Sequence, residues 1–307
     1  MPSTQEFRRR IKSVSSTKQI TKAMEMIASI KMQKSVKTIA QARAYIQNSW
    51  NILHLLSEKI LSDDHALVNP KDHQKRTAVI LITSDRGLCG SYNSEVIKKF
   101  VNFEKEECSC DTDTKTCGEY LGSCDVIAIG KVGASFVNRY KLGKLIAEFK
   151  GFENNISLED VIPISKLTNG EYLAGNYERI VVVYSHFISS LRQVPVVKQI
   201  LPIIEDHVEG DIEWVKPEND AETEYKFEPN PDEVFDGVLR QILRTQIYGA
   251  VLEANASEHS ARMVAMKNAT DNATDLVDEL KLIYNSIRQG NITSEIAEIS
   301  GAAEAMK

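Results

Sequence analysis

The stretch TAVILITSDRGLCGSYN, residues 77–93, joins an apolar run to a turn with two glycines and then to the start of a helical pattern. Many phosphate-binding sites of α/β proteins begin with a strand, a glycine turn and a helix in this order. Here Gly87 and Gly90 give only G-x-x-G, which matches neither the P-loop nor the dinucleotide fingerprint. The stretch therefore predicts an α/β domain, and it favours a plain tight turn over a nucleotide site.

The region around this stretch, residues 76–204, alternates strand and helix signals. Strands are predicted at 77–83, 125–130, 145–149, 179–187 and 195–201, and helices at 93–105, 132–141 and 157–175. This alternation is typical of a mostly parallel, Rossmann-like sheet with helices on its faces. The acidic, turn-rich residues 205–229 follow, and a solvated linker is favoured there over a last pairing of two short strands.

A long helical pattern precedes this region. Residues 3–60 contain neither Gly nor Pro, and Ser3 with Glu6 forms a capping box at their start. Apolar residues repeat with a heptad spacing along this helical pattern, but their register changes in its middle. There the apolar positions move to Ile20, Met24 and Ile27. We expect this part of the helix to face something other than its coil partner.

A second long helix is predicted from residue 231 to about 303. Asn230, Pro231 and Glu233 give a strong start signal, and an apolar seam then repeats every 3.5 residues on average. His259 falls on this seam, and a role in coil register is favoured over a role as a ligand. The predicted fold is therefore α/β, with a long antiparallel two-helix coiled coil and a central Rossmann-like domain. The predicted segments are 1–60, 76–204, 205–229 and 231–307.

Charge is unevenly distributed along the chain. The net charge of −6 divides into +8 for residues 1–60, −9 for 61–230 and −5 for 231–307. The basic first segment favours pairing with the later segments or with an acidic partner. The mild total excludes a general nucleic-acid or membrane binder, and no apolar run approaches the ~20 residues of a membrane span.

Five cysteines are present, and four lie in one window as Cys108, Cys110, Cys117 and Cys124. Their spacing does not match common zinc sites, so free thiols in a surface loop are favoured over a metal or redox site. Cys89 is interpreted as a small packing residue. No catalytic, cofactor-binding or metal-binding motif is found.

Four segments together resemble the gamma subunit of F-type ATP synthases. They are ITKAMEMIASIKMQKS (20–35), ITSDRGLCGSYN (82–93), the stretch from EVFDGVLRQILRTQIYGAVLEANASEHSARM to ATDL (233–276), and YNSIRQGNITSEIAEISGAAEA (284–305). The resemblance implies a non-catalytic rotor shaft without cofactors, whose coil enters a head of three alpha and three beta subunits. It also implies a foot domain that binds epsilon and the c-ring, and indirect links to the delta, a and b subunits.

The resemblance further implies a peripheral protein at the cytoplasmic face of a bacterial plasma membrane, or at a mitochondrial or chloroplast membrane in an organelle. It implies no nucleic-acid partner and no direct insertion into the bilayer. The alternative interpretation is a nucleotide- or small-molecule-binding α/β protein with coiled-coil arms.

Site residues follow from the resemblance by motif. RQGNITSE matches the family's catch segment, which contacts a loop of beta, and this implies roles for Arg288, Gln289, Thr293 and Glu295. Met24 matches the position that faces the lever region of beta. Lys22 and Arg8–Arg10 are weaker candidates. The family's end signature departs after Glu298, where either Gly301 arrives one place early or Ala302 replaces the glycine.

Overall fold

The computed structural model of the chain describes residues 4–57, 67–68, 76–107, 124–153, 156–203, 228 and 230–306. These residues belong to two compact units. The first comprises Met1–Ser29 with Arg262–Lys307, and the second is Ile30–Ala261. Two helices, α1 (Thr4–Ser57) and α5 (Pro231–Ala305), each contribute residues to both units.

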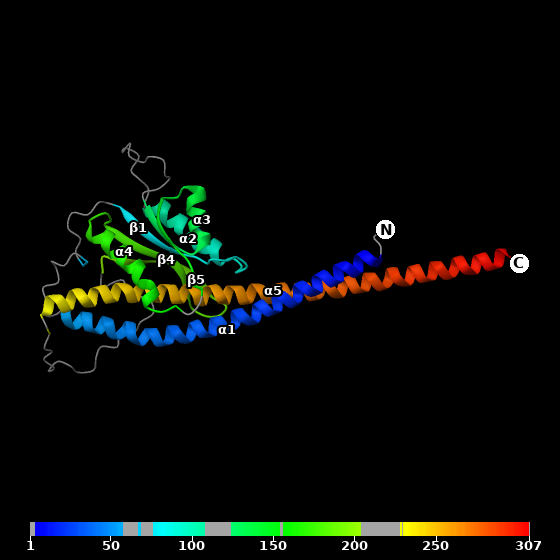
Figure 1. Cartoon of the computed structure of the whole chain (residues 1–307), viewed down its shortest axis with the longest axis horizontal. Helices are drawn as coiled ribbons and strands as arrows, with labels where there is room; N and C mark the ends of the chain where they lie inside the picture. Colours follow the sequence, from blue (N-terminus) through cyan, green and yellow to red (C-terminus); the bar gives the residue numbers. More distant parts are fainter. Residues whose placement is uncertain are drawn as a thin grey trace. The chain divides into compact units, whose positions relative to one another are not determined.

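The second unit contains a five-stranded sheet in the order β3-β2-β1-β4-β5 (Figure 1). The strands are β1 (Thr77–Ile82), β2 (Cys124–Ile129), β3 (Lys144–Phe149), β4 (Arg179–Phe187) and β5 (Gln193–Leu201). Four of them pair in parallel, and β5 runs antiparallel to β4 at one edge. The prediction of a mostly parallel sheet is confirmed.

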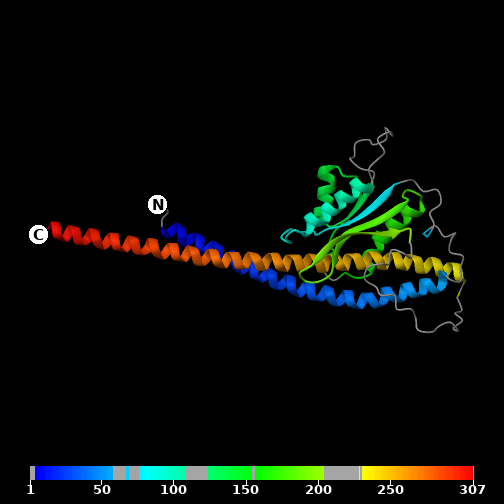
Figure 2. The same ribbon diagram turned by 180° about the vertical axis from the view of Figure 1, so that it is seen from behind.

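Helices pack on both faces of this sheet. They are α2 (Tyr92–Glu107), α3 (Lys131–Tyr140), the short η2 (Glu159–Val161), α4 (Ile162–Leu173) and the part of α5 in this unit. Because successive side chains of a strand point to opposite faces, β1 serves two cores. Val79 and Leu81 pack with α2 and α3, whereas Ile80 and Ile82 pack with α4 and α5. Figure 2 shows α5 along that second face.

Helix α5 begins where the sequence signal of Asn230, Pro231 and Glu233 predicts it. Asn230 Oδ1 accepts a hydrogen bond from the Glu233 amide at 2.8 Å, and Asn230 Nδ2 donates to the Glu233 carboxylate at 2.8 Å. Within the second unit α5 is buried on more sides than a coiled-coil seam requires. Its extra apolar face joins the core of the sheet through Leu239, Leu243, Ile247, Val251 and Ala254.

α1 packs antiparallel to α5. In the second unit Ile39 clusters with Leu252, whereas Tyr45, farther along α1, accepts a hydrogen bond from Gln241, earlier in α5. A Cβ at Gly249 would meet the Ile46 side chain, which explains a small residue on the seam. The predicted two-helix coil is confirmed.

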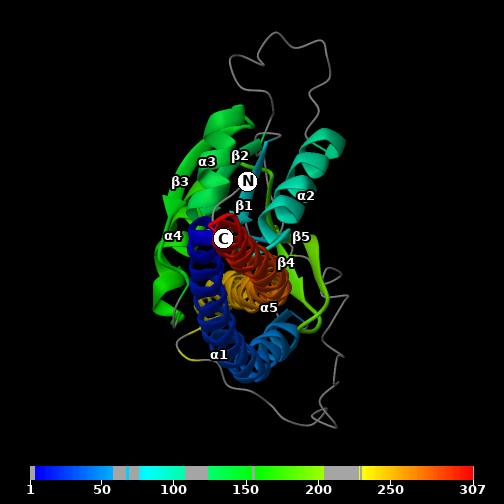
Figure 3. The ribbon, with the colours of Figure 1, turned by 90° about the vertical axis from the view of Figure 1, so that its right-hand side faces the viewer.

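The first unit is a two-helix coil on its own (Figure 3). The hydroxyl of Thr270 donates to the hydroxyl of Thr21 across the two helices at 2.8 Å. Buried side chains are spread along the two helices of this unit, among them Phe7, Ala28, Met266, Ala273, Val277 and Leu280.

The cysteine window requires one correction. Cys124 is the first residue of β2, only 1% exposed, and packs in the core between the sheet and α2. It is disulfide-bonded, and the other half of the bond lies outside the described residues. The expectation of a free surface thiol is therefore wrong for Cys124, because this position begins a buried strand.

Several expectations lie outside the described residues. They concern the Ser3 cap, residues 58–60, Cys108, Cys110, Cys117 and nearly all of the acidic stretch 205–229. The division of the chain into four segments stays a prediction.

Candidate functional site

The turns after β1 and β2 lie at the carboxyl edge of the sheet, where many α/β folds bind phosphate, and side chains of the β1 turn already occupy the amides that begin α3. The amide of Lys131 at the start of α3 donates to the Asp85 carboxylate at 3.0 Å, and the amide of Gly133 donates to Thr83 Oγ1 at 2.9 Å. A phosphate at a helix N-terminus needs such amides for itself. This geometry supports a structural role for the β1 turn and counts against a phosphate at the N-terminus of α3.

The same turn is held together from within. Asn93 accepts from the Ser84 amide at 3.0 Å and donates to the Ser84 hydroxyl at 2.7 Å. Gly90 and Leu88 both adopt positive φ, at 59° and 64°. Cys89 is a buried thiol outside any disulfide and packs in the core beside α2, so its interpretation as a packing residue is confirmed.

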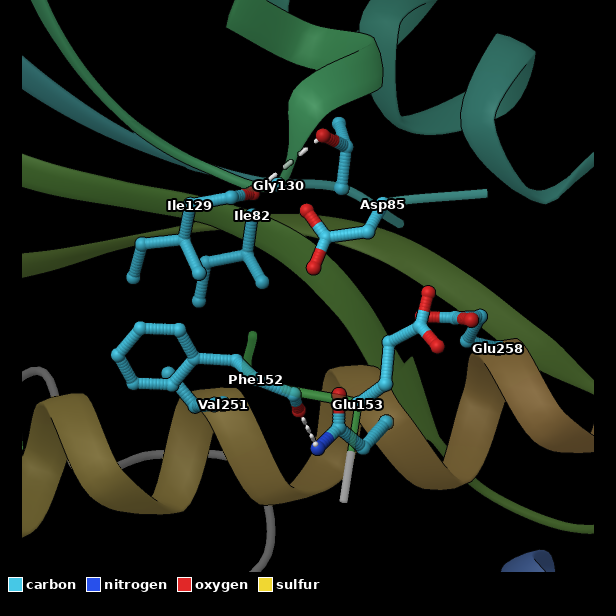
Figure 4. A pocket seen from close by; sticks show the side chains of 10 residues that line it. Ile82, Asp85, Ile129, Gly130, Phe152, Glu153, Val251 and Glu258 are labelled. Carbon is cyan, nitrogen blue, oxygen red and sulfur yellow. Dashed lines mark hydrogen bonds between the residues drawn. The ribbon is translucent and has the colours of Figure 1, made fainter. Parts of the chain in front are cut away.

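A small cavity lies beneath this turn, between the sheet and α5 (Figure 4). Its polar lining includes Thr83, Asp85, Glu153, Asn255 and Glu258. The cavity volume is about 10 Å³, close to the space that one water molecule needs. A nucleotide or a drug-sized ligand requires a pocket of hundreds of Å³, so this cavity is not a substrate site.

The part of α1 where the heptad register changes exposes apolar side chains in the first unit. Ile20 is 59% exposed and Ile27 is 55% exposed, whereas Ala28 is buried and Met24 is half-buried. The prediction that part of this stretch faces away from the coil partner is confirmed for Ile20 and Ile27. Lys22, one of the weaker candidates, pairs with Glu25 of its own helix at 3.0 Å.

The four catch residues are all exposed on α5 in the first unit, and they do not share one face. At 3.6 residues per turn, Arg288 and Glu295 point in nearly the same direction, and Gln289 and Thr293 point roughly 130° away. The Thr293 hydroxyl donates to the Gln289 carbonyl at 2.9 Å. The catch segment thus presents two polar pairs.

An apolar stripe lies between these pairs. Ile292, Ile296 and Ile299 are 47%, 59% and 71% exposed, and their spacing of four and three residues places them on one helix face. From Lys281 onward, nearly every described position of α5 is exposed. An exposed apolar stripe with polar borders is typical of a protein-binding surface.

Met24 and the catch segment are not brought together. Thr21, one turn before Met24, faces Thr270, and Arg288 lies 18 residues farther along α5. That separation is about 27 Å along the helix. The predicted lever contact at Met24 and the predicted catch contact therefore lie at different places along the coil.

One set of buried residues was missed from the sequence. Glu253 and the polar residues between 255 and 260 of α5 contact loops of the sheet domain. The sequence signal that could have indicated these contacts is the dense run of polar residues in EANASEHS, 253–260. His259 belongs to this set, because its Nε2 lies 3.3 Å from the Glu153 carbonyl. Its interpretation as a residue of coil register is corrected accordingly.

Comparison with known proteins agrees with this architecture. The family described as "ATP synthase" matches residues 3–306. The ATP synthase gamma chain of Nitrosomonas eutropha is 35% identical over 306 residues, covering 100% of both chains. The gamma chain of Alkaliphilus metalliredigens is 39% identical over 305 residues, covering 99% of this chain and 98% of the relative.

A solved structure shares the fold. A chain in the cryo-EM structure of the Euglena gracilis mitochondrial ATP synthase, with OSCP, F1 and c-ring in rotational state 3, superposes with a TM-score of 0.65. It is 19% identical, and the match covers 99% of this chain and 94% of that one.

Two long antiparallel helices joined to a sheet domain are the architecture that this chain shares with the solved ATP synthase chain. The chain belongs to the ATP synthase gamma-chain family, the non-catalytic rotor stalk subunits of F-type ATP synthases. Within the part of the chain that the structure describes, no helix combines the length and apolar character needed to cross a membrane.

Proposed function

We propose that this chain couples ion-driven rotation of a c-ring to conformational changes at three catalytic beta subunits. The coil turns inside a head of three alpha and three beta subunits, and the sheet domain forms a foot that binds epsilon and the c-ring. The delta, a and b subunits are linked to it only indirectly. On this proposal the chain is peripheral at the cytoplasmic face of a bacterial plasma membrane, or at the corresponding membrane of a mitochondrion or chloroplast.

The exposed end of α5 carries this proposal. Its apolar stripe at Ile292, Ile296 and Ile299 has no cover among the described residues, although burying such side chains is worth roughly 1.5–3 kcal/mol each. A surrounding sleeve of partner subunits supplies that burial. Family membership identifies the sleeve as the head of the synthase.

The coupling follows from symmetry. A two-helix coil has no threefold axis, so it presents a different surface to each of three identical beta subunits. Each orientation therefore stabilises a different conformation in each subunit, and rotation shifts those populations in turn. The different directions of the two catch pairs, Arg288 with Glu295 and Gln289 with Thr293, support such unequal contacts.

The first test is native mass spectrometry of the tagged chain purified gently from its own cells. We expect one copy with three copies each of two partners of roughly 50 kDa, about three typical domains apiece. A lone monomer or a self-dimer, under conditions that keep large complexes intact, would reject the proposal. ATP binding by the isolated chain would then favour the alternative of a nucleotide-binding protein.

The catch pairs are tested separately in the assembled complex. We expect Arg288→Ala with Glu295→Ala, and Gln289→Ala with Thr293→Ala, each to lower ATPase turnover without unfolding the chain. Glu298→Ala, at a neighbouring exposed position, is the matched control. Wild-type turnover in both double variants would remove the catch assignment.

A further inference from the structure

A run of polar side chains on α5 is buried against the sheet domain. We call Glu253, Asn255, Ser257, His259 and Ser260 the docking belt. The last four are at most 9% exposed, and the Glu253 side chain is 19% exposed. Buried polar groups destabilise a protein unless they are hydrogen-bonded. Apolar residues would hold α5 to the sheet as firmly, so a polar belt needs another reason.

One side of the belt binds the end of β4 and the turn that follows it. The contacts are Ser257 Oγ to the Ser185 carbonyl at 2.9 Å, Ser260 Oγ to the Ser190 carbonyl at 2.5 Å, and Glu253 Oε2 to His186 Nδ1 at 2.6 Å. Two of these bonds end on backbone carbonyls, so they fix the path of the chain itself.

The other side of the belt binds the loop after β3. Asn255 Nδ2 donates to the Phe152 carbonyl at 2.6 Å, a bond drawn in Figure 4. His259 Nε2 lies 3.3 Å from the next carbonyl, that of Glu153. This loop is in turn tied to the turn after β1, because the Gly151 amide donates to Asp85 at 2.9 Å.

The two sets of contacts lie on different sides of the helix. At 3.6 residues per turn, the side chains that bind the β4 end and those that bind the β3 loop point roughly 150° apart. Burial of apolar surface is non-directional and lets a helix turn against its neighbour, whereas hydrogen bonds weaken steeply when misaligned. Bonds on two sides therefore resist rotation of α5 about its own axis.

We propose that the docking belt is the rotational lock of the stalk, the joint that transmits turning force between the sheet domain and α5. The inference rests on the proposed function, because a lock against rotation matters only in a chain that carries torque. The belt residues are positioning residues. They are buried between α5 and the sheet domain, and they act by holding α5 at a fixed angle there.

The test measures torsional stiffness in the assembled complex. The head is fixed to a surface, a bead is attached through Lys98→Cys on the exposed side of α2, and the angular variance of the bead is recorded while rotation is stalled. We expect Ser257→Ala with Ser260→Ala to increase the variance roughly 1.7-fold, because it removes two of the five bonds that act in parallel. Variance equal to that of the wild type would overturn the proposal.

Two further variants separate a lock from general stabilisation. Thr245→Val also removes a buried hydroxyl, but this hydroxyl bonds only to the Gln241 carbonyl of its own helix, so we expect unchanged variance. Glu253→Gln retains an acceptor for His186 and should keep the stiffness that Glu253→Leu loses. Equal variance in the Gln and Leu variants contradicts the lock.

The outcomes also separate this inference from the proposed function. A chain that is absent from the synthase complex, or a complex whose bead never rotates with ATP, rejects both. Rotation with unchanged stiffness in the belt variants rejects the lock alone. If the double serine variant does not assemble, the single Ser257→Ala and Glu253→Leu variants decide by the same measurement.

Discussion

Gly130 and the carbonyl of Thr83 approach so closely that a Cβ on Gly130 would clash with that carbonyl. The two residues follow the neighbouring parallel strands β2 and β1, and Gly130 has φ of +97°. The Thr83 amide and hydroxyl both donate to the carbonyl of Ile129. The carboxyl edge of the sheet is therefore built around one glycine.

Gly130→Ala should lower the free energy of unfolding by roughly 3 kcal/mol or more, because it combines a clash with backbone and a strained φ. Denaturant unfolding of the purified chain measures this change. Gly170→Ala is the control, since nothing lies within 4 Å of the added Cβ in helix α4. It should be neutral or stabilising by up to about 1 kcal/mol. Equal unfolding midpoints for the two variants would contradict the geometry.

Asp85→Ala should lower the free energy of unfolding by about 1–2 kcal/mol, since it leaves the amides of Lys131 and Gly151 without their acceptor. Glu106→Ala, at an exposed position of α2, is the control and should change little. Calorimetric titration of the wild-type chain with ATP should give no binding heat. Saturable ATP binding that Asp85→Ala strengthens would show that the turn is a ligand site after all.

The environment of Tyr177 leads us to expect that the free energy of unfolding decreases at alkaline pH. Burial raises its pKa above the ordinary value, and its hydrogen bond to Asp125 at 2.7 Å raises the pKa further. The native state then holds the phenolic proton longer than the unfolded state does. The stabilisation is complete below about pH 10 and decreases as the pH rises toward the native pKa.

The unfolding free energy of the wild type should therefore decrease more steeply above pH 10 than that of Tyr177→Phe, by up to about 1.4 kcal/mol per pH unit. Unfolding by urea at a series of pH values measures the two slopes. Tyr140→Phe, at a position 55% exposed, is the control and should keep the wild-type slope. Parallel curves for Tyr177→Phe and the wild type would refute the assignment.

Met24→Lys should impair coupling in the assembled synthase, because it places a charge beside the exposed apolar side chains of Ile20 and Ile27 where a partner surface is proposed. The measurement is ions pumped per ATP hydrolysed in sealed vesicles. Met24→Leu keeps the apolar volume and should retain the wild-type ratio. An unchanged ratio in Met24→Lys means that Met24 does not lie at the lever contact.

Much of the fold was predictable because each element carries a local signal. The five strands were placed within two residues of their bounds, and the clearest signals came from β1, β2 and β4, because buried parallel strands are short apolar runs between turns. The start of α5 was equally clear, because Asn230 and Glu233 form a capping box whose contacts are local in sequence.

The features that the sequence did not predict depend on contacts between residues that are far apart in the chain. A heptad pattern identifies the face of α5 that meets α1, but it does not reveal that Leu243 and Ile247 face a sheet. Likewise, Ser257 gives no sign that its acceptor is a carbonyl 72 positions away. The catch residues were proposed only through family resemblance and stay a prediction, because an exposed polar helix looks the same whether or not a partner covers it.

The exposed last turns of α5 have a consequence for the proteolysis of copies of the chain that are not assembled. From Lys281 onward nearly every described position is exposed, so tertiary packing gives this end of the helix little support. A helix without tertiary packing is only marginally stable in water, and proteases act on such locally opened segments. On the proposed function, we therefore expect this end of α5 to be cleaved faster in an unassembled copy than in the assembled enzyme.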